Sequence, residues 1–437
     1  MSDKKANPAN AAHQAGDRDV EFNGSGYILN PYQLYVSDPR SESDQGFYEI
    51  QNGQRGSQSG NIGRHKSDGT LDHDFGNGGR FTYPFMDDPY FTVLDSEGFI
   101  FSTDQKETTI TCVGVSEFLK PDGTGSLVNV PAAIRIFATG KPDIKFGKGG
   151  KQLFKLKVDG EADTSTKEYF SPWNSVRASV RQQDGSVLFP CRLINSQVAT
   201  FHLVKFDVDG LPVKGFGDNG VKAIPPTSDL WADYAAGSDG SVTLAGHFNN
   251  GRALGVVSRY TSAGVLDTQF AGGRKIIDLP ELPGVTSILL KKVWYGDEDG
   301  VTLHANIHDS TDGKDKLAII KLTKYGEYDP AFQGGEPWVV SEVDTSLQAF
   351  ALMAVDDQQR MVISYNQTAL DVRLVRLLKD GNRDLAFGSD GSVVHPNIGP
   401  ATELIIQNGV DILLKAFFRE TVNDRAVLFR FFGESAA

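Results

Sequence analysis

The sequence of 437 residues holds only two cysteines, Cys112 and Cys191. Two cysteines set far apart form neither a disulfide framework nor a metal-ligand motif, so each is expected to be a small buried apolar side chain. The first ten residues contain no apolar segment, and no later run reaches the length that crosses a membrane. We therefore predict no Sec-type signal peptide, no membrane span, and a protein that is cytoplasmic or exported by a route that leaves no such signal.

An excess of positive charge is also missing. Lysine and arginine number 43 against 56 aspartates and glutamates, which gives a formal net charge of −13. This balance argues against a surface that follows nucleic-acid phosphates and against binding to an anionic membrane surface. No glycine-rich phosphate loop precedes a helix, the G-x-S-x-G nucleophile motif is absent, and no long helix is indicated. The sequence therefore assigns no catalytic residue.

Glycine, by contrast, is abundant at 47 residues, and many of these glycines recur at fixed spacing. They belong to a segment, typified by Asp68 to Gly79, that repeats along the chain. Aligned copies share a phenylalanine, at Phe22, Phe75, Phe146, Phe216, Phe270, Phe332 and Phe387. A glycine stands six residues before each of them, at Gly16, Gly69, Gly140, Gly210, Gly264, Gly326 and Gly381. A second glycine follows each of them, at Gly26, Gly79, Gly150, Gly220, Gly273, Gly335 and Gly391. Glycine at a repeated position indicates a backbone with positive φ, so the motif predicts a structural turn.

Two further positions of the repeat are polar. An aspartate precedes the phenylalanine by three residues in every copy except the fourth, which has Val213. Such a carboxylate can accept backbone N–H bonds and cap one helical turn that carries the phenylalanine into the core. A cation stands eleven residues before the phenylalanine within an apolar run, at Arg64, Arg135, Lys205, Arg259, Lys321 and Arg376, and Arg430 has the same setting in the last strand. We expect strands with one outward cation, paired with the motif aspartate.

The segments between motifs predict β-strands. In the fourth repeat, apolar runs cover 221–224, 231–236, 241–246 and 254–260. The second and third runs are joined by Asp239-Gly240, and related junctions recur at Glu97-Gly98, Asp184-Gly185, Asp299-Gly300 and Asn408-Gly409. Asp-Gly and Asn-Gly favour two-residue β-hairpins. Four antiparallel strands in each of seven units predict an all-β, seven-bladed β-propeller.

The two ends of the chain look like halves of one interrupted repeat. The first motif has no strand before it, and the last strand, 426–432, has no motif after it. This predicts a ring closed between the N-terminal turn and the C-terminal strand. The predicted organisation is a flexible tail over 1–15, one propeller over 16–432 and a second tail over 433–437. The D-G-x-L-D-x-x-F-G-x-x-G motif, repeated roughly every 60 residues, resembles the delta-60 repeat family, whose members are β-propellers. The resemblance implies architecture and no catalytic residue.

Antiparallel order also separates two faces of the ring. The motif turns and the Asp-Gly hairpins must lie at one face, here called the motif face, and the remaining loops at the other, here called the loop face. Insertions are predicted at the loop face, over 103–131, 155–172 and 306–316. Variable loops are typical of a binding face. We therefore place the functional site at the loop face or in the axial channel beneath it.

Aromatic side chains end several loops at this face, with a histidine nearby. Exposed rings suit stacking on sugars or anchoring a protein partner, although rings at these positions could equally fill gaps between blades. The candidate binding residues are Tyr32, Tyr90, Phe170, Trp173, Trp231 and His247.

Metal-binding patterns are weak. His304 and His308 have the spacing of a chelate on a helix, but they are predicted on a strand, where they would stand about 13 Å apart. Asp309, Asp312 and Asp315 only loosely resemble a calcium loop.

Three functions fit these observations. The favoured one is a non-enzymatic propeller, of unknown oligomeric state, that binds a protein or a carbohydrate through its loop face. The second is a propeller hydrolase or lactonase with a divalent cation such as calcium in the channel, for which Asp87, Asp88, His247 and His308 are candidates. The third is a structural module of a secreted or toxin-like assembly.

Overall fold

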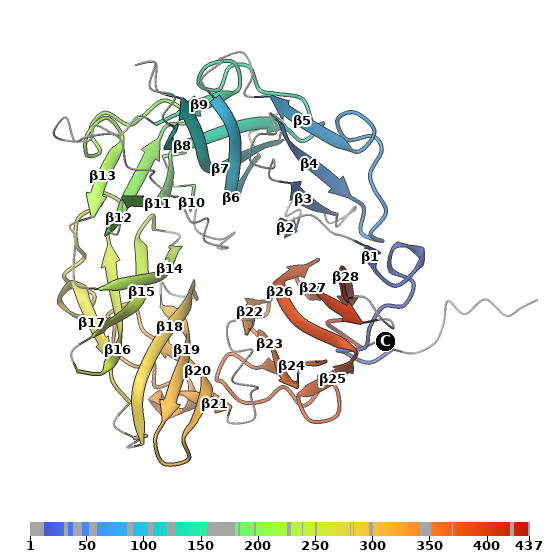
Figure 1. Cartoon of the computed structure of the whole chain (residues 1–437), viewed down its shortest axis with the longest axis vertical. Helices are drawn as coiled ribbons and strands as arrows, with labels where there is room; N and C mark the ends of the chain where they lie inside the picture. Colours follow the sequence, from blue (N-terminus) through green and yellow to red (C-terminus); the bar gives the residue numbers. More distant parts are fainter. Residues whose placement is uncertain are drawn as a thin grey trace, which may run out of the picture.

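The computed structural model describes most of the chain, and the structural statements that follow concern the residues it describes. These are 13–29, 34–37, 46–51, 59–84, 91–103, 108–119, 127–154, 180–181, 184–195, 198–224, 229–237, 239–249, 251–279, 281–282, 284–296, 300–340, 351–368, 370–419 and 424–435. They form seven antiparallel four-stranded sheets. Figure 1 shows these sheets as blades arranged around a central axis. The chain is therefore a seven-bladed β-propeller, as predicted.

Each blade is described from the axis outward. Blade one contains β2 (Leu34–Ser37), β3 (Phe47–Gln51), β4 (Ser59–His65) and β5 (Arg80–Pro84). Blade two contains β6 (Phe91–Thr103), β7 (Thr108–Leu119), β8 (Leu127–Phe137) and β9 (Lys151–Leu153). Blade three contains β10 (Val180–Arg181), β11 (Val187–Asn195), β12 (Val198–Phe206) and β13 (Val221–Ile224). Blade four contains β14 (Leu230–Ala236), β15 (Val242–Asn249), β16 (Ala253–Tyr260) and β17 (Arg274–Ile277).

The remaining blades follow the same plan. Blade five contains β18 (Val285–Tyr295), β19 (Val301–Asp309), β20 (Lys314–Leu322) and β21 (Trp338–Val340). Blade six contains β22 (Leu352–Val355), β23 (Met361–Thr368), β24 (Asp371–Leu377) and β25 (Ser392–Pro396). Blade seven contains β26 (Ile398–Gln407), β27 (Asp411–Arg419), β28 (Asp424–Phe431) and β1 (Ile28–Leu29).

The grouping of strands into blades differs in one respect from the sequence-based expectation. The strand after each motif turn pairs with the strand before that turn, as β17 does with β16. It is therefore the outermost strand of that blade and not the first strand of the next one. The next strand along the chain is the innermost strand of the following blade, as β18 is after β17 (Figure 1).

Blade seven is built from both ends of the chain. Strand β1 pairs with β28, which sets Ile28 opposite Leu428. The turn before β1 is joined to β28 as well, because Nε of Arg430 donates to Oδ2 of Asp19 at 2.8 Å. The N–H of Gly388, in blade six, donates to the carbonyl of Ala15 at 2.9 Å. The ring is thus closed between the N-terminal turn and the C-terminal strand, as predicted.

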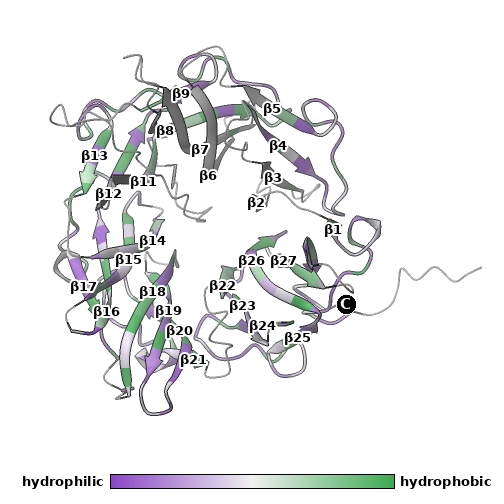
Figure 2. Ribbon diagram, viewed as in Figure 1, coloured by the Kyte–Doolittle hydropathy of each residue, from purple (hydrophilic) through white to green (hydrophobic). Residues whose placement is uncertain are grey.

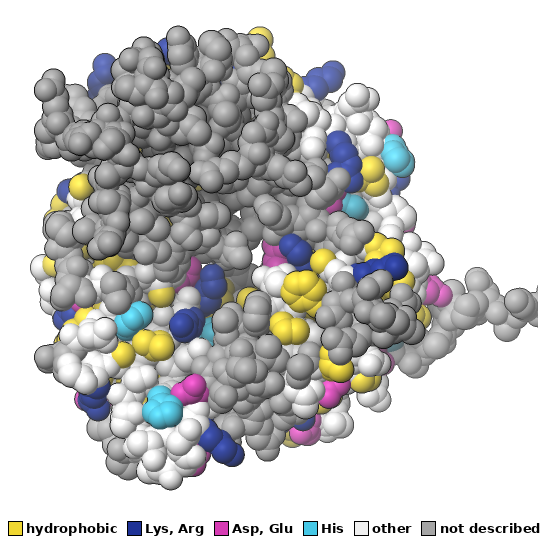
Figure 3. Space-filling view, viewed as in Figure 1, with side chains coloured by type: hydrophobic (Ala, Val, Ile, Leu, Met, Phe, Trp, Pro, Cys, Tyr) yellow, Lys and Arg dark blue, Asp and Glu magenta, His cyan; other side chains and the backbone are white. Residues whose placement is uncertain are grey.

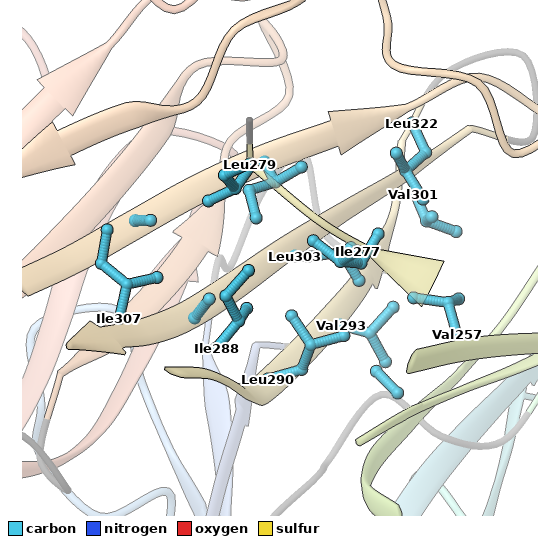
Figure 4. Close-up of a cluster of buried hydrophobic side chains, with 14 of the residues drawn as sticks. Val257, Ile277, Leu279, Ile288, Leu290, Val293, Val301, Leu303, Ile307 and Leu322 are labelled. Carbon is cyan, nitrogen blue, oxygen red and sulfur yellow. The ribbon is translucent and has the colours of Figure 1, made fainter. Parts of the chain in front are cut away.

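The core lies between neighbouring blades. Between blades four and five, Val257 and Ile277 pack with Leu290, Val293 and Leu303, and all five side chains are at most 3% exposed. Figure 4 shows this cluster. Hydrophobic residues alternate with polar ones along many strands (Figure 2), because each sheet buries side chains against its neighbours.

The motif turns have the predicted geometry. All seven motif phenylalanines are at most 4% exposed. The first motif glycines have φ between 68° and 96°, and the second ones between 80° and 97°. The motif aspartates accept a hydrogen bond from the backbone N–H two residues on, as Oδ1 of Asp329 does from Ala331 at 2.9 Å. Three turns contain a short 3-10 segment, η1 (Phe22–Gly24), η2 (Ala271–Gly273) and η4 (Gln333–Gly335).

The repeated cations pair with the motif aspartates as predicted, but the expectation that they point outward is wrong. Nε of Arg376 donates to Oδ2 of Asp384 at 2.7 Å, and its side chain is 1% exposed. The guanidinium lies 4.7 Å from the ring centroid of Phe387. The cation is therefore held between the motif carboxylate and the motif ring. The fourth copy, which has Val213, differs: Lys205 lies 3.8 Å from the hairpin carboxylate of Asp184.

Two other expectations need correction. Glu97-Gly98 is not a hairpin, because it lies inside β6, at a register shift between Ser96 and Gly98. The segment 306–316 is no loop insertion, because β19 and β20 extend through it and leave only 310–313 between them. Similarly, β7 and β8 occupy much of 103–131, and the predicted insertion at 155–172 lies outside the described residues.

The two predicted faces are present. Oδ2 of Asp239, in the β14–β15 hairpin, accepts from Nη2 of Arg259 at 2.8 Å, and Arg259 also pairs with the motif aspartate Asp267 at 3.2 Å. Hairpin and motif turn therefore meet at the same end of blade four, which is the motif face.

Candidate functional site at the centre of the ring

Several predicted binding residues lie outside the described part of the chain. These are Tyr32, Tyr90, Phe170 and Trp173, together with the metal candidates Asp87 and Asp88. Trp231 is described and is 6% exposed, packed with Leu188, Phe216 and Leu244 between blades three and four. Its ring fills a gap between blades, which was the alternative reading of the loop aromatics.

His247 lies near the loop-face end of β15, opposite Leu230 on β14. Its imidazole is half-buried, and no described residue makes a hydrogen bond with its Nδ1. Burial lowers the pKa of His247, and the positive charge of Lys291 on β18 lowers it further. His247 is therefore a neutral imidazole beside a cation at the junction of blades four and five.

The structure separates the two histidines of the weak metal pattern. His304 is 2% exposed on β19, and burial lowers its pKa to about 3. His308 is partly exposed and its Nδ1 lies 2.6 Å from Oδ1 of Asp315. In the neighbouring turn, Nζ of Lys316 lies 2.6 Å from Asp309 and 3.0 Å from Asp312. Two of the three carboxylates in the segment that loosely resembles a calcium loop, Asp309 and Asp312, are therefore paired with Lys316.

Among the described residues, no group of three or more histidine, cysteine or carboxylate side chains is placed to hold a metal ion. Cys112 is buried with a free thiol, as expected for a small apolar side chain, and burial raises its pKa well above the ordinary range. No described helix is long and apolar enough to cross a membrane.

The innermost strands carry a feature that sequence reasoning missed. Four of them contain a β-bulge or register shift, at Ser96/Gly98 in β6, Trp231/Asp233 in β14, Leu290/Lys292 in β18 and Ala401/Glu403 in β26. A bulge adds one residue to a strand and redirects the neighbouring side chains, and bulges are common next to functional sites. Because these strands border the axis (Figure 1), the bulges occupy the centre of the ring.

Charged side chains occupy the bulges in β14 and β18. Asp233 is 3% exposed, its Oδ2 accepts from the backbone N–H of Val293 at 2.9 Å, and its Oδ1 lies 3.7 Å from Nζ of Lys292. Burial raises the pKa of Asp233, while Lys292 and the N–H of Val293 act in the opposite direction. Lys291, half-buried beside them, has no ion-pair partner among the described residues.

The bulge in β26 has a second set of opposite charges. Glu403 lies directly across from Lys415 of β27, and both side chains are half-buried. Burial lowers the pKa of Lys415, and Glu403 partly restores it. Figure 3 shows the ring hollowed at its centre, with acidic and basic side chains around the opening. We call Asp233, Lys291, Lys292, Glu403 and Lys415 the channel set.

The sequence offered a partial signal for this set. Lys291-Lys292 and Asp233 stand inside apolar runs that are otherwise typical of strands. Burying a charge in such a run costs folding free energy unless the charge is paired. Without knowing which strand is innermost, however, these charges cannot be assigned to the channel.

Comparison with known proteins gives a family match over a short segment. The family described as "Domain of unknown function (DUF5122) beta-propeller" matches residues 237–270, which run from the β14–β15 hairpin to Phe270 in blade four. No curated protein matches the chain.

Several solved structures are similar over most of the chain. One is a protein of unknown function from Dyadobacter fermentans, with 11% identity, a TM-score of 0.38, and coverage of 94% of this chain and 99% of that one. Another is the β-propeller domain of the trilobed protease from Pyrococcus furiosus, with 12% identity, a TM-score of 0.41, and coverage of 94% and 96%. A third is the NanB sialidase from Streptococcus pneumoniae, with 10% identity, a TM-score of 0.36, and coverage of 92% and 71%. At these scores the likenesses carry no argument about ligand or activity.

Proposed function

We propose that this protein is a non-enzymatic binding module whose channel set holds a polypeptide segment that carries both acidic and basic side chains. The ligand enters from the loop face and lies against the bulged inner strands β14, β18 and β26. The delta-60 repeat resemblance and the matched propeller family are consistent with this role but specify no ligand.

The observation that carries the proposal is the placement of opposite charges on bulges of three inner strands. The carboxylate of Asp233 is fixed by the backbone N–H of Val293, and Glu403 is fixed opposite Lys415 by strand register. Charges held in place before binding lose little conformational freedom when a ligand arrives. The half-buried lysines of the channel set and the half-buried carboxylate of Glu403 complement a segment of mixed charge and discriminate against a segment of one sign. The buried carboxylate of Asp233 holds Lys292 in place.

A carbohydrate is less well supported by the described residues. Stacking on a sugar needs an open aromatic face, and Trp231, the described member of the predicted aromatic set, is buried in the core. A metal-dependent hydrolase is a separate outcome of the test below.

The test is a displayed random-peptide library and a glycan array, probed with the same purified protein, whose metal content is also measured. We expect selection of peptides with mixed charge. Their affinity should fall about tenfold or more in Lys291→Glu and in Glu403→Lys, since each reverses a half-buried charge that the ligand contacts. Lys314→Glu is the matched control, because Lys314 is exposed at the end of β20, away from the inner strands, and this variant should bind normally.

Three results would overturn the proposal. Glycan binding without peptide binding would favour the carbohydrate reading, and stoichiometric metal with hydrolytic turnover would favour the enzyme. If Lys291→Glu and Lys314→Glu weaken peptide binding by the same amount, the peptide binds outside the channel set.

A further inference from the structure

Exposed apolar side chains gather on the motif face. The motif turn of a blade is defined here as the residues between its third strand and its outermost strand. Of the thirteen large apolar side chains that are exposed in the described chain, nine lie in these turns: Val20, Ile144, Val208, Leu211, Val265, Leu266, Tyr325, Leu378 and Leu385. Leu385 and Ile144 are the most exposed of all, at 74% and 72%. Single exposed apolar residues are ordinary, but their concentration on one face of a ring marks an interaction surface.

The turns that carry these side chains are linked to one another around the ring. At six of the seven junctions, the residue after the motif phenylalanine donates its N–H to a carbonyl in the turn of the next blade. Examples are Gly147 to Asp209 at 2.7 Å and Gln333 to Asp380 at 2.9 Å. At the junction of turns three and four, Nζ of Lys222 instead lies 3.5 Å from the carbonyl of Ala263. The last link, from Gly388 to Ala15, closes the ring of turns at the chain termini. The apolar side chains are therefore presented on a linked surface and not on independent loops.

The charges on this face differ between turns in a complementary way. The turn of blade two surrounds Ile144 with exposed Lys141, Lys145 and Lys148, and its Asp143 is buried in an ion pair with Arg135. The turn of blade seven instead surrounds Val20 with exposed Asp17 and Glu21. One copy of the chain thus carries both halves of a charge-complementary contact.

We propose that the motif face binds a second copy of this chain, face to face, about a twofold axis through the turn of blade one. A closed twofold contact uses the same surface on both copies. This axis sets turn two of one copy against turn seven of the other, turn three against turn six, and turn four against turn five. Every such pair brings exposed apolar side chains together. Turn one, which meets itself on the axis, is the turn that contributes none of the nine.

The shape of the face is consistent with this pairing. A hollow of about 420 Å³ lies between the turns of blades five and six, lined by Ala331, Gln358, Arg360, Leu378, Lys379 and Asp380. The proposed axis sets this hollow opposite the turns of blades four and three. Leu211 of turn three is 50% exposed and is the side chain that we assign to it. Seven turns also supply more than the roughly 20–30 residues per partner that a stable interface uses.

The experiment is the molar mass of the full chain across a dilution series, measured by light scattering during size-exclusion chromatography. We expect a concentration-dependent dimer. Leu385→Glu should raise the dimer dissociation constant about tenfold or more, because each substitution acts twice across the axis. Val394→Glu is the matched control, because Val394 is exposed on β25 of the same blade but lies outside the turns, and it should leave the dimer intact.

The pairing of turns two and seven is tested by a charge exchange. Lys145→Glu and Glu21→Lys should each weaken the dimer about tenfold, and the double variant should restore it because the two charges change places. A monomer at all concentrations, or a dimer that Leu385→Glu leaves intact, would overturn the proposal. If the two single variants weaken the dimer and the double variant does not restore its affinity, the proposed axis is wrong. None of these variants alters the channel set, so failure here leaves the proposed ligand site standing.

Discussion

At the scale of single residues, the repeat is maintained by a charged side chain that is buried rather than exposed. Arg376 contacts the carboxylate of Asp384 and the ring of Phe387, and it also donates through Nη1 to the carbonyl of Gly433. A buried ion pair contributes little net stability, yet removal of one partner leaves the other charge buried without compensation. The equivalent pair in blade five, Lys321 with Asp329 at 3.6 Å, is more exposed.

This contrast gives a stability prediction at equivalent positions. Arg376→Met should lower the free energy of unfolding by about 2–3 kcal/mol, because the buried Asp384 carboxylate loses its nearer cation and keeps only Arg360, at 3.8 Å. Lys321→Met should cost less, about 1 kcal/mol, because the ion pair is longer, at 3.6 Å, and the Asp329 carboxylate keeps partial contact with water. Urea unfolding of both variants measures the difference. Equal losses would show that the two cations are equivalent.

His304 predicts a dependence of stability on pH. Its folded pKa of about 3 is depressed below the ordinary value of 6.5, because burial disfavours the charged imidazole. The unfolded chain therefore binds a proton more readily below pH 6.5, and stability is lost as pH falls toward 3. Between pH 7 and pH 5 this residue alone should cost about 2 kcal/mol.

His304→Gln removes that titration. Urea midpoints at pH 7 and pH 5 should draw closer together in the variant than in the unchanged protein. His308→Gln is the control, because His308 is partly exposed and pairs with Asp315. If acid destabilises His304→Gln and the unchanged protein by the same amount, the imidazole of His304 is not the group that titrates.

At the scale of elements, the motif turn is the part of the fold that the sequence specifies most completely. Gly140 and Gly149 belong to the same turn and both have positive φ, at 75° and 67°. Their surroundings differ. A Cβ added to Gly140 would lie 2.5 Å from the backbone nitrogen of Gly76 in the neighbouring turn, whereas one added to Gly149 would meet nothing within 4 Å.

Gly140→Ala should therefore destabilise the protein more than Gly149→Ala does. Both variants strain the backbone by about 1 kcal/mol, but Gly140→Ala must also push two blades apart. Thermal unfolding should show a clearly larger loss for Gly140→Ala. If both variants lose a similar amount of stability, only the local backbone conformation matters, and the neighbouring turn can move aside to accommodate the added methyl group.

The elements also show where sequence reasoning stops. Internal repetition identified the turn glycines and the buried phenylalanines, because seven copies share one backbone conformation. The pair Glu97-Gly98 misled because a glycine between apolar runs fits a bulge as well as a hairpin. The period of the repeat did not show that the strand following each motif turn is the outermost strand of the same blade. The channel set was missed for a related reason, since which strand is innermost is a property of the ring.

At the scale of the whole molecule, the termini decide whether the ring stays closed. The N-terminal segment supplies Phe22, which is 1% exposed, the Asp19 partner of Arg430, and the strand that covers the edge of β28. An uncovered β28 would present unpaired backbone N–H and C=O groups, which promote association between chains. Closure is thus a contact between two ends of the chain that the rest of the propeller holds close together.

This arrangement predicts that closure can be restored from outside the chain. A protein that begins at residue 30 should unfold at a lower temperature and self-associate more than the full chain. A separate peptide of residues 13–29 should raise its unfolding temperature in a concentration-dependent way, since at one hundred times its dissociation constant the peptide adds about 2.7 kcal/mol to the free energy of unfolding. The same peptide with Phe22→Ala should do so only at much higher concentration, because it loses a buried ring worth about 3–5 kcal/mol. If the shortened protein is as stable as the full chain, or if both peptides act equally, β1 and its turn are not what closes the ring.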